Sequence, residues 1–421
     1  MRPTPRSFRL HIGLFGRRNV GKSSLLNAIT RQSVSIVSDH AGTTTDPVEK
    51  PMEFLPLGPV LFIDTAGIDD AGTLGELRVE KTRNAFDRTD LAVLITDGAW
   101  DEFEEGIVAE FTSREVPILV VFNKVDLSEP SAETVGMLQE REVPYVRTVA
   151  SESEGILDFR RALLDTAPAE ALKSPPIAAD LVGPGGMAVL VVPIDKEAPK
   201  GRLIMPQVQT IRDLLDGDAY CMVVKDLELR EALARLRDRP DLVITDSQAF
   251  EKVAADTPQE IPMTSFSVLF ARLKGDLVTQ AEGAAAVEGL RPGDRILVAE
   301  ACSHHPIEED IGRVKIPRWL TDHVGGPLDF TTVQGHDFPD DLSEYSLVIH
   351  CGGCVHNRRE MLSRLLRCRE ANVPITNYGI IIAHTLGIAE RALGPFPVAL
   401  EAWRTKMQEA DAQYAGDRHA D

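Results

Sequence analysis

The chain has 421 residues, of which 43% are hydrophobic, and its formal net charge is −20 at pH 7. This length exceeds what one ordinary core occupies and predicts two or three domains, with three as the working number. The acidic balance argues against a protein that mainly grips nucleic acid, so we expect no nucleic-acid partner.

The sequence shows no pattern typical of a membrane span or a secretion signal. Its first residues, Met1–Arg6, lack an apolar core, and no run of about 18 apolar residues occurs. We therefore expect a soluble, cytoplasmic protein without a membrane partner. The odd number of cysteines, five, argues against a disulfide framework and leaves metal or redox chemistry as the alternatives.

Short apolar runs alternate with helical patterns in the first part of the chain, which predicts a mostly parallel sheet covered by helices. The predicted strands are Leu10–Phe15, Val60–Ile63, Leu91–Thr96, Ile118–Phe122 and Tyr145–Thr148. Consecutive prolines in Ala171–Ile177 then indicate a linker. We place a first domain over residues 1–172.

The rest of the chain continues the α/β alternation and is divided into residues 173–264 and 265–421. In the second domain we expect strands at Ala188–Ile194, Tyr220–Val224 and Leu242–Thr245, and helices at Gln207–Leu215 and Glu228–Arg237. In the third we expect one long helix over Ser267–Ala286, strands at Arg295–Ala299 and Ser346–Ile349, helices at Arg358–Arg369 and Ile380–Ala392, and a frayed tail from Asp411.

A phosphate-binding loop follows the first predicted strand. The segment Gly16-Arg-Arg-Asn-Val-Gly21-Lys22-Ser23 fits the P-loop pattern in its required strand-loop-helix setting. Backbone N–H groups of such a loop surround phosphates, Lys22 reaches the β- and γ-oxygens, and Ser23 offers a hydroxyl to magnesium. The expected nucleotide contacts here are Gly16, Asn19, Val20, Gly21, Lys22, Ser23 and Ser24.

Two further motifs identify the nucleotide as GTP. Asp64-Thr-Ala-Gly67 ends a predicted strand, which places a carboxylate beside magnesium and the Gly67 N–H beside the γ-phosphate. Asn123-Lys124-Val-Asp126 ends another strand. The Asp126 carboxylate can accept both the N1–H and the exocyclic amine of guanine, a donor pair that adenine lacks.

A threonine between the P-loop and Asp64 should close over the magnesium ion. Thr44 is the favoured ligand, and Thr43 is its close rival. Together the motifs predict an α/β protein in which a Ras-like P-loop GTPase domain is followed by two smaller α/β domains. They also predict GTP and Mg²⁺ as ligands.

Over about residues 8–168 the chain resembles the GTPases of bacterial tRNA modification and ribosome assembly. In that group the asparagine matched by Asn19 helps to bind a potassium ion, so the resemblance implies K⁺-stimulated GTP hydrolysis. Their guanine-contacting loop is matched in part by Val149–Ser151, which leaves the backbone N–H groups of Ala150 and Ser151 as base contacts. Asp70 matches an acidic residue of the tRNA-modifying relatives and either helps to position water or is a solvated acid.

Cysteine and histidine residues gather near the end of the chain. Cys302-Ser-His304 and His350-Cys351-Gly-Gly-Cys354 each follow a predicted strand, and such loops converge at one edge of an open α/β sheet. The residues themselves permit either a zinc site or an iron-sulfur cluster, with zinc slightly favoured by abundance. Cys221 and Cys368 lie in apolar patterns typical of core positions.

The Cys/His spacing, on the C-terminal side of a GTPase domain of this type, resembles the maturation GTPase of iron-iron hydrogenases. The segment Asp195–Asp213 resembles the middle domain of the same family, so the resemblance covers nearly the whole chain. The resemblance implies a 4Fe-4S cluster held by Cys302, Cys351 and Cys354. It leaves His304 and His350 as alternatives for the fourth ligand, for orienting a sulfur, or for capping a strand. It also implies a homodimer formed by the middle domain.

The resemblance further implies a scaffold and carrier that takes a di-iron precursor from radical-SAM proteins and delivers it to apo-hydrogenase. The sequence has no radical-SAM triple-cysteine motif of its own. Two alternatives stay open. One is an RNA-modification or ribosome-assembly GTPase with a zinc-binding accessory domain, and the other is a metal-delivery GTPase for a different metalloenzyme.

Overall fold

The computed structural model describes residues 5–32, 48–54, 57–65, 84–168, 175–193, 203–301, 310–353 and 355–417. These residues form two compact units, Met1–Ser174 and Pro175–Asp421, and each is described by itself. Most of the expected linker, and the expected magnesium ligand Thr44, lie outside the described residues. Among the residues described, no helix is both long and apolar enough to cross a lipid bilayer.

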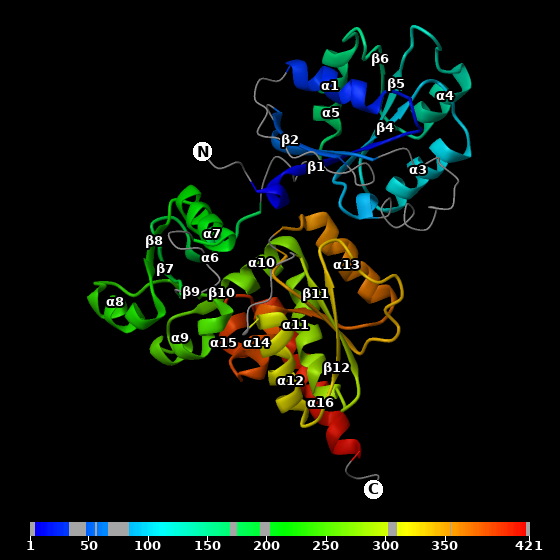
Figure 1. Ribbon diagram of the computed structural model, residues 1–421. Coiled ribbons are helices and arrows are strands. Elements are labelled where there is room, and N and C mark those ends of the chain that lie inside the picture. The colour runs from blue at the N-terminus through cyan, green and yellow to red at the C-terminus, as the bar shows by residue number, and fades with distance from the viewer. Residues whose placement is uncertain are drawn as a thin grey trace. The chain divides into compact units, whose positions relative to one another are not determined.

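The N-terminal unit is built on a six-stranded sheet with the order β2-β3-β1-β4-β5-β6 (Figure 1). Its strands are β1 (Leu10–Phe15), β2 (Val48–Phe54), β3 (Gly58–Asp64), β4 (Leu91–Thr96), β5 (Ile118–Asn123) and β6 (Tyr145–Thr148). All neighbours pair in parallel except β2, which runs antiparallel to β3. The five predicted strands of this unit are confirmed, and β2 is an additional edge strand.

Helices cover both faces of this sheet. They are α1 (Lys22–Gln32), α3 (Glu102–Ser113), α4 (Ala132–Glu140) and α5 (Ile156–Thr166). One core packs α1 and α5 against one face through residues such as Leu25 and Phe159. The other packs α3 and α4 against the opposite face through residues such as Phe111 and Leu138. Two buried faces explain why the central strands read as continuous apolar runs.

The C-terminal unit holds two four-stranded, parallel sheets, which are joined by shared helices. The first has the order β10-β9-β7-β8 and the second β12-β11-β13-β14. The strands are β7 (Met187–Val191), β8 (Tyr220–Val224), β9 (Leu242–Thr245), β10 (Met263–Ser265), β11 (Arg295–Glu300), β12 (Asp329–Gln334), β13 (Leu347–His350) and β14 (Ile375–Asn377). The fold class predicted from the sequence is confirmed.

The longer helices of this unit alternate with these strands. They are α7 (Met205–Asp216), α8 (Leu229–Arg235), α9 (Phe250–Asp256), α10 (Phe266–Lys274), α11 (Leu277–Ala285), α12 (Ile316–Val324), α13 (Arg358–Glu370), α14 (Tyr378–Thr385), α15 (Ala389–Leu393) and α16 (Pro397–Asp417). Ala383 of α14 and Ala392 of α15 belong to the core of the first sheet, whereas Ile381 and Ile382 belong to the core of the second. One helix thus serves both sheets, and the boundary between residues 264 and 265 stays a prediction.

Two helices that were expected to be continuous are each interrupted in the structure. The expected helix Ser267–Ala286 is two helices, because α10 ends before Gly275 and Asp276 caps α11 by accepting from the Val278 and Thr279 N–H groups. The side chain of Asp276 thus satisfies N–H groups at the start of a new helix. The expected helix Ile380–Ala392 is likewise split into α14 and α15, with Gly387 between them at φ +71°.

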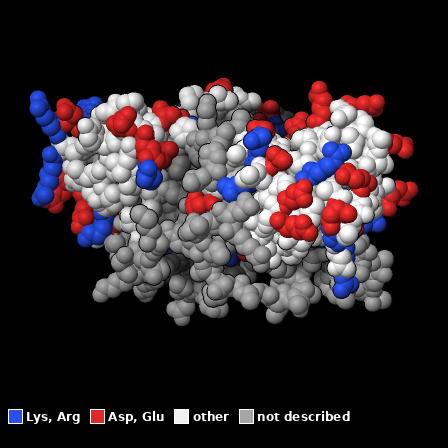
Figure 2. Space-filling view, turned by 90° about the horizontal axis from the view of Figure 1, so that it is seen from above, with Lys and Arg blue, Asp and Glu red and all other residues white. Residues whose placement is uncertain are grey.

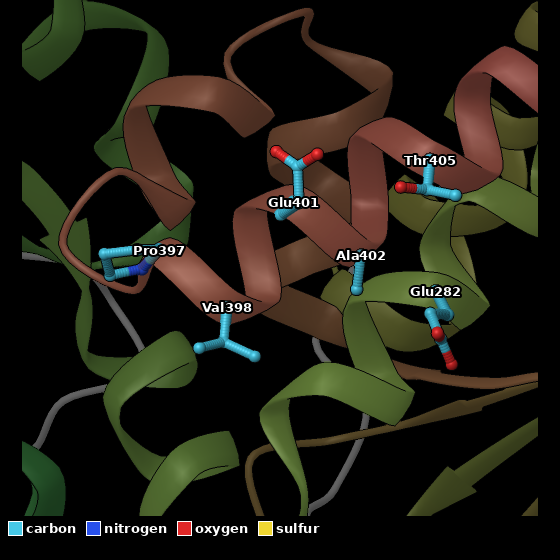
Figure 3. Close-up of a pocket in the computed structure, with 6 residues that line it drawn as sticks. All are labelled: Glu282, Pro397, Val398, Glu401, Ala402 and Thr405. Atoms are coloured by element: carbon cyan, nitrogen blue, oxygen red, sulfur yellow. The ribbon is translucent and has the colours of Figure 1, made fainter.

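The C-terminal helix α16 lies along α11. A shallow hollow between them is shown in Figure 3 and is lined by Glu282 of α11 and by Pro397, Val398, Glu401, Ala402 and Thr405 of α16. Val398 is largely exposed there. The opposite side of α11 packs tightly against β14, where a Cβ atom on Gly283 would lie 2.0 Å from the carbonyl oxygen of Ile375.

This close approach generates a stability prediction. Gly283→Ala should destabilise the C-terminal unit by about 1–3 kcal/mol, because the added methyl group forces helix and strand apart. Gly289→Ala is the matched control, since its Cβ would have no described heavy atom within 4 Å. The control should change stability by no more than about 0.5 kcal/mol. Thermal unfolding followed by circular dichroism measures both, and equal unfolding temperatures would contradict the tight contact.

Candidate functional site

The P-loop of the N-terminal unit turns through backbone conformations that its sequence specifies. Gly16 and Gly21 have φ values of +141° and +101°, a region that side chains disfavour. A Cβ on Gly16 would lie 2.1 Å from the carbonyl oxygen of Ile95, and one on Gly21 would lie 2.2 Å from Asn123 Nδ2. Asn19 also lies in the left-handed region, at φ +65°, and its side chain is exposed.

Lys22, at the start of α1, is buried and directed back across this loop. Its ammonium group donates to the carbonyl oxygens of Gly16 at 2.6 Å and Arg17 at 2.7 Å. The next residue, Ser23, donates its hydroxyl to Asp64 Oδ2 at 3.0 Å, where β3 ends. The loop therefore brings one ammonium, one hydroxyl and one carboxylate together, which is the donor set of a nucleotide–magnesium site.

The environment of Asp64 suits a cation. Burial raises the pKa of its carboxyl group, and the Ser23 hydrogen bond and the charge of Lys22 oppose that rise. A bound divalent ion would offset the cost of keeping this carboxylate charged. Ser23 and Asp64 are the two expected magnesium ligands that the structure describes, and it brings them into contact.

Asn123 ties the P-loop to the loops that follow β5 and β6. Its amide nitrogen donates to the carbonyl oxygen of Val20 at 2.8 Å. Its amide oxygen accepts from the Thr148 hydroxyl and from the Ala150 N–H, each at 3.0 Å. The side chain is almost fully buried, so losing these bonds would leave several polar groups without partners.

The remaining expected nucleotide residues lie on the same three loops. Lys124 has φ +59° and donates from Nζ to the carbonyl oxygen of Asn19 at 2.7 Å. Asp126, Ser151 and Ser24 are exposed, and Val20 is buried. Thr44, Gly67 and Asp70 lie outside the described residues.

Arg17 is a P-loop residue that sequence reasoning missed. Its guanidinium donates to both carboxylate oxygens of Glu104, at 2.8 and 3.0 Å, and also to Asp101. Asp101 and Glu104 form the capping box that starts α3. The sequence signal was present, because a carboxylate three residues after an N-cap aspartate is a recognisable pattern, but the arginine partner lies 87 residues away.

A second group of polar residues gathers at the carboxyl edge of the sheet β12-β11-β13-β14. Ala299 of β11 and His350 of β13 are direct neighbours in register, so the residues after them leave the sheet side by side. The N–H of Ala301 donates to Cys351 Sγ at 3.0 Å. The segment that leads into Cys302 therefore contacts the cysteine of the other segment. Cys302, His304 and Cys354 themselves lie outside the described residues.

His350 is completely buried, and both of its ring nitrogens are engaged. Arg364 Nη1 lies 2.9 Å from Nε2, and since a guanidinium only donates, Nε2 accepts. Nδ1 then carries the proton and donates to the Cys351 carbonyl oxygen at 2.8 Å. Burial, followed by the charge of Arg364, lowers the pKa of His350 to about 3, so the ring is neutral at pH 7. This geometry orients the backbone of Cys351.

Lys274 is a second residue that sequence reasoning missed. It ends α10, is 3% exposed, and donates to the carbonyl oxygens of Gly353 and His356, each at 2.7 Å. Gly353 has φ +59°, which suits the tight turn between Cys351 and Cys354. No local motif could reveal this lysine, because the bonded carbonyls are 79 and 82 residues distant.

The P-loop, the contact between Ser23 and Asp64, and the Asn123 network define the N-terminal unit as a GTPase domain. The family model described as a 50S ribosome-binding GTPase matches residues 11–124. Two models from one other family match the rest: the hydrogen maturase F dimerization domain at residues 177–275 and the tetramerization domain at residues 278–395. These two together span just over half of the chain, which belongs to the hydrogen maturase F family.

Two curated relatives, both tRNA modification GTPases, match a little over a third of the chain. The tRNA modification GTPase MnmE of Chromobacterium violaceum is 38% identical over 163 residues, which are 37% of this chain and 34% of that protein. MnmE of Cyanothece sp. is 34% identical over 160 residues, with the same shares. The chain thus spans about a third of the length of these relatives.

Solved structures match between about a third and a half of the chain at low sequence identity. The G domain of the T. maritima FeoB iron transporter has 18% identity and a TM-score of 0.30, covering 38% of this chain and 98% of that one. Aquifex aeolicus Era has 20% identity and a TM-score of 0.32, covering 51% of this chain and 92% of that one.

The hydrogen bonds of Asn123 generate a prediction that separates effects on stability from effects on guanine recognition. Asn123→Ala should destabilise the N-terminal unit by about 2–4 kcal/mol and weaken GTP binding, because three buried hydrogen bonds are lost at once. Asp126→Asn is its counterpart on an exposed side chain. It should leave stability within about 0.5 kcal/mol while weakening GTP binding by several kcal/mol.

Denaturant unfolding and calorimetric GTP titration of both variants check this prediction. If Asp126→Asn bound GTP as tightly as the unmodified chain, the guanine contact assigned to Asp126 would be wrong. If Asn123→Ala kept full stability, the network would not hold the loops together.

Proposed function

We propose that this chain is a scaffold and carrier in the maturation of iron-iron hydrogenase. It holds a 4Fe-4S cluster through Cys302, Cys351 and Cys354, accepts a di-iron precursor as cargo from radical-SAM maturation proteins, and delivers it to apo-hydrogenase. The observation that carries the proposal is the hydrogen bond from the Ala301 N–H to Cys351 Sγ, because it joins the two segments that contain the cysteines.

The described residues at this edge fit a thiolate-held cluster. Cys351 is a thiol outside any disulfide, and an N–H donated to its sulfur stabilises the thiolate form. The buried ammonium of Lys274 adds positive charge beside the same turn. Three cysteines leave one iron of a 4Fe-4S cluster for a further ligand, which in this proposal is protein-supplied, weakly held or exchangeable.

The contacts of His350 narrow the choice of the fourth ligand to the cluster. Since its two ring nitrogens already bond to Arg364 and to the Cys351 carbonyl, we propose that it positions this cysteine. His304 then stays the alternative for the fourth iron.

The GTPase domain, in this proposal, hydrolyses GTP with Mg²⁺ and is stimulated by K⁺. Ser23, Asp64 and Thr44 would hold magnesium, and Lys22 and the Gly67 N–H would contact the γ-phosphate. Asp70 would help to position water. Asn19 would bind potassium, and its exposed side chain on a left-handed backbone supports that role. The proposed guanine contacts are Asn123, Lys124, Asp126, Ala150 and Ser151.

We also propose a homodimer through the middle sheet. Strand β8 is an edge strand, and it exposes Tyr220 and Val223. Helix α7 exposes Val208 and Leu215. An apolar edge of this kind is normally covered by another chain. The matching dimerization model supports the same assignment.

The RNA-related alternative has less support. The tRNA modification GTPases named above match 37% of the chain, whereas the two hydrogen maturase F models match residues 177–275 and 278–395. On the face drawn in Figure 2, the described Lys and Arg side chains are interspersed with Asp and Glu side chains. An interspersed surface of that kind does not resemble the basic stripe of an RNA-binding domain.

The potassium proposal predicts a salt-dependent rate. GTP hydrolysis should be at least several-fold faster in KCl than in NaCl at equal ionic strength, because the smaller ion fits a potassium site poorly. Asn19→Ala should abolish that difference between the two salts. Phosphate release measures all four rates, and equal rates for the unmodified chain in both salts would sink the proposal.

The cluster proposal predicts a spectroscopic loss. Anaerobic reconstitution of the full chain should give about four irons per chain and the paramagnetic signal of a reduced 4Fe-4S cluster. Cys302→Ala, Cys351→Ala and Cys354→Ala should each remove the signal and should fail to activate apo-hydrogenase when co-produced with the other maturation proteins. GTP hydrolysis should persist in all three.

Cys221→Ala serves as the control for this series. It removes a thiol from β8, in the other sheet, and should keep both the iron and the signal. Recovery of tightly bound zinc without any reconstitutable cluster would overturn the cluster assignment and favour the accessory zinc domain instead.

A further inference from the structure

A buried imidazole beside the proposed cluster loop lacks hydrogen-bond partners among the residues that the structure describes. His356 is 1% exposed, and neither of its ring nitrogens has a hydrogen-bond partner among the described residues. Glu360 Oε2, in the first turn of α13, likewise has no partner among the described residues. Leaving such groups unpaired costs about 1–3 kcal/mol each, and native interiors rarely tolerate it. Two adjacent groups of this kind therefore need an explanation.

His336 completes the group from a different segment. It follows β12, its side chain is 44% exposed, and its ring stacks on that of His356 with centroids 5.4 Å apart. His336 Nδ1 lies 2.9 Å from Glu360 Oε1, and His356 Nε2 lies 3.4 Å from the same oxygen. One potential ligand atom of each of the three residues lies within 4.8 Å of the others.

These separations match those between ligands of one metal ion. Bonds of about 2.0–2.2 Å in a tetrahedral site place ligand atoms about 3.3–3.6 Å apart. The separation of 3.4 Å from His356 lies within that range, and the separation of 2.9 Å from His336 is somewhat shorter. Two imidazoles and one carboxylate form a donor set typical of zinc and similar ions, with a position left for water.

We propose that His336, His356 and Glu360 bind a divalent first-row metal ion, with zinc as the best match to this donor set. This donor set contains none of the cysteines proposed to hold the cluster. Arg364 Nη2 also donates to Glu360 Oε1 at 3.1 Å, and Oε2 of the same carboxylate has no hydrogen-bond partner among the described residues, so this carboxylate can still take a cation. A bound ion would tie the segment after β12 to the start of α13 and brace the turn that Lys274 holds from the other end.

A second His/Glu cluster in the same unit shows why the first is unusual. Glu288, His323 and His384 also lie close together. There Trp403 Nε1 donates to His384 Nδ1 at 3.2 Å, which leaves the protonated Nε2 to donate to Glu288 at 2.9 Å. Both ring nitrogens of His384 thus have hydrogen-bond partners without a metal, whereas neither ring nitrogen of His356 has one within the described part of the chain.

Zinc binding to the full chain tests the proposal. Cys302→Ala, Cys351→Ala and Cys354→Ala are combined in one variant, so that zinc cannot occupy the cysteines. After treatment with a chelator and titration with ZnCl₂, this variant should bind one zinc per chain in the micromolar range or tighter. Zinc should also raise its unfolding temperature.

Further substitutions in that background locate the ligands. Glu360→Gln keeps the size of the side chain and should weaken zinc binding at least tenfold, and His336→Ala, at a partly exposed position, should do the same without unfolding the chain. His323→Ala in the second cluster is the matched control and should bind zinc unchanged. Cobalt in place of zinc should give visible bands without the near-ultraviolet absorption that thiolate ligation produces.

Either of two results would overturn the inference. One is that the triple cysteine variant binds no stoichiometric zinc. Any zinc found in the unmodified chain would then be bound by the cysteines. The other is equal zinc affinity after His336→Ala and Glu360→Gln. Neither result bears on the proposed cluster, whose iron and spectrum are measured with the cysteines in place.

Discussion

Parallel strands bring their carboxyl ends to one edge of a sheet, and both sites of this protein depend on that constraint. In the GTPase domain, β1, β3 and β5 deliver the P-loop, Asp64 and Asn123 to one place, although these lie far apart in the chain. In the C-terminal unit, the pairing of β11 with β13 brings Ala301 to Cys351. Strand pairing therefore supplies the proximity, and buried side chains such as Asn123 and His350 then fix the orientation of the loops.

The central elements were predictable because burial on both faces produces long apolar runs. The strands missed by sequence reasoning lack that signal. Strand β2 contains Pro51 and charged residues and lies at a sheet edge, where such residues are tolerated. Strand β12 is half-exposed and polar, while β10 and β14 have three residues each. The continuous helix expected over Ser267–Ala286 failed for a different reason, since Asp276 competes for the backbone N–H groups.

At the sites, residue types within motifs were predictable and their supporting contacts were not. The P-loop and Asn123 follow from local patterns, and the structure places them in contact. Lys274, Arg364 and Arg17 act through partners in distant segments, so only the folded chain reveals them. His356 shows that a residue outside any recognised motif can also matter. Its position in the sequence suggested nothing, and its importance arises because burial removes every alternative partner among the described residues.

Helix α14 has a consequence for how this protein can be divided. Its consecutive residues Ile381, Ile382 and Ala383 enter the cores of two different sheets, and α15 continues into the core of the first. A recombinant fragment that carried only the sheet β10-β9-β7-β8 would leave Val189 and Phe250 facing water where Ala383 and Ala392 now pack. Such a fragment should be poorly soluble. Gene fusions or exchanges that treat residues 175–421 as one cassette keep both cores intact.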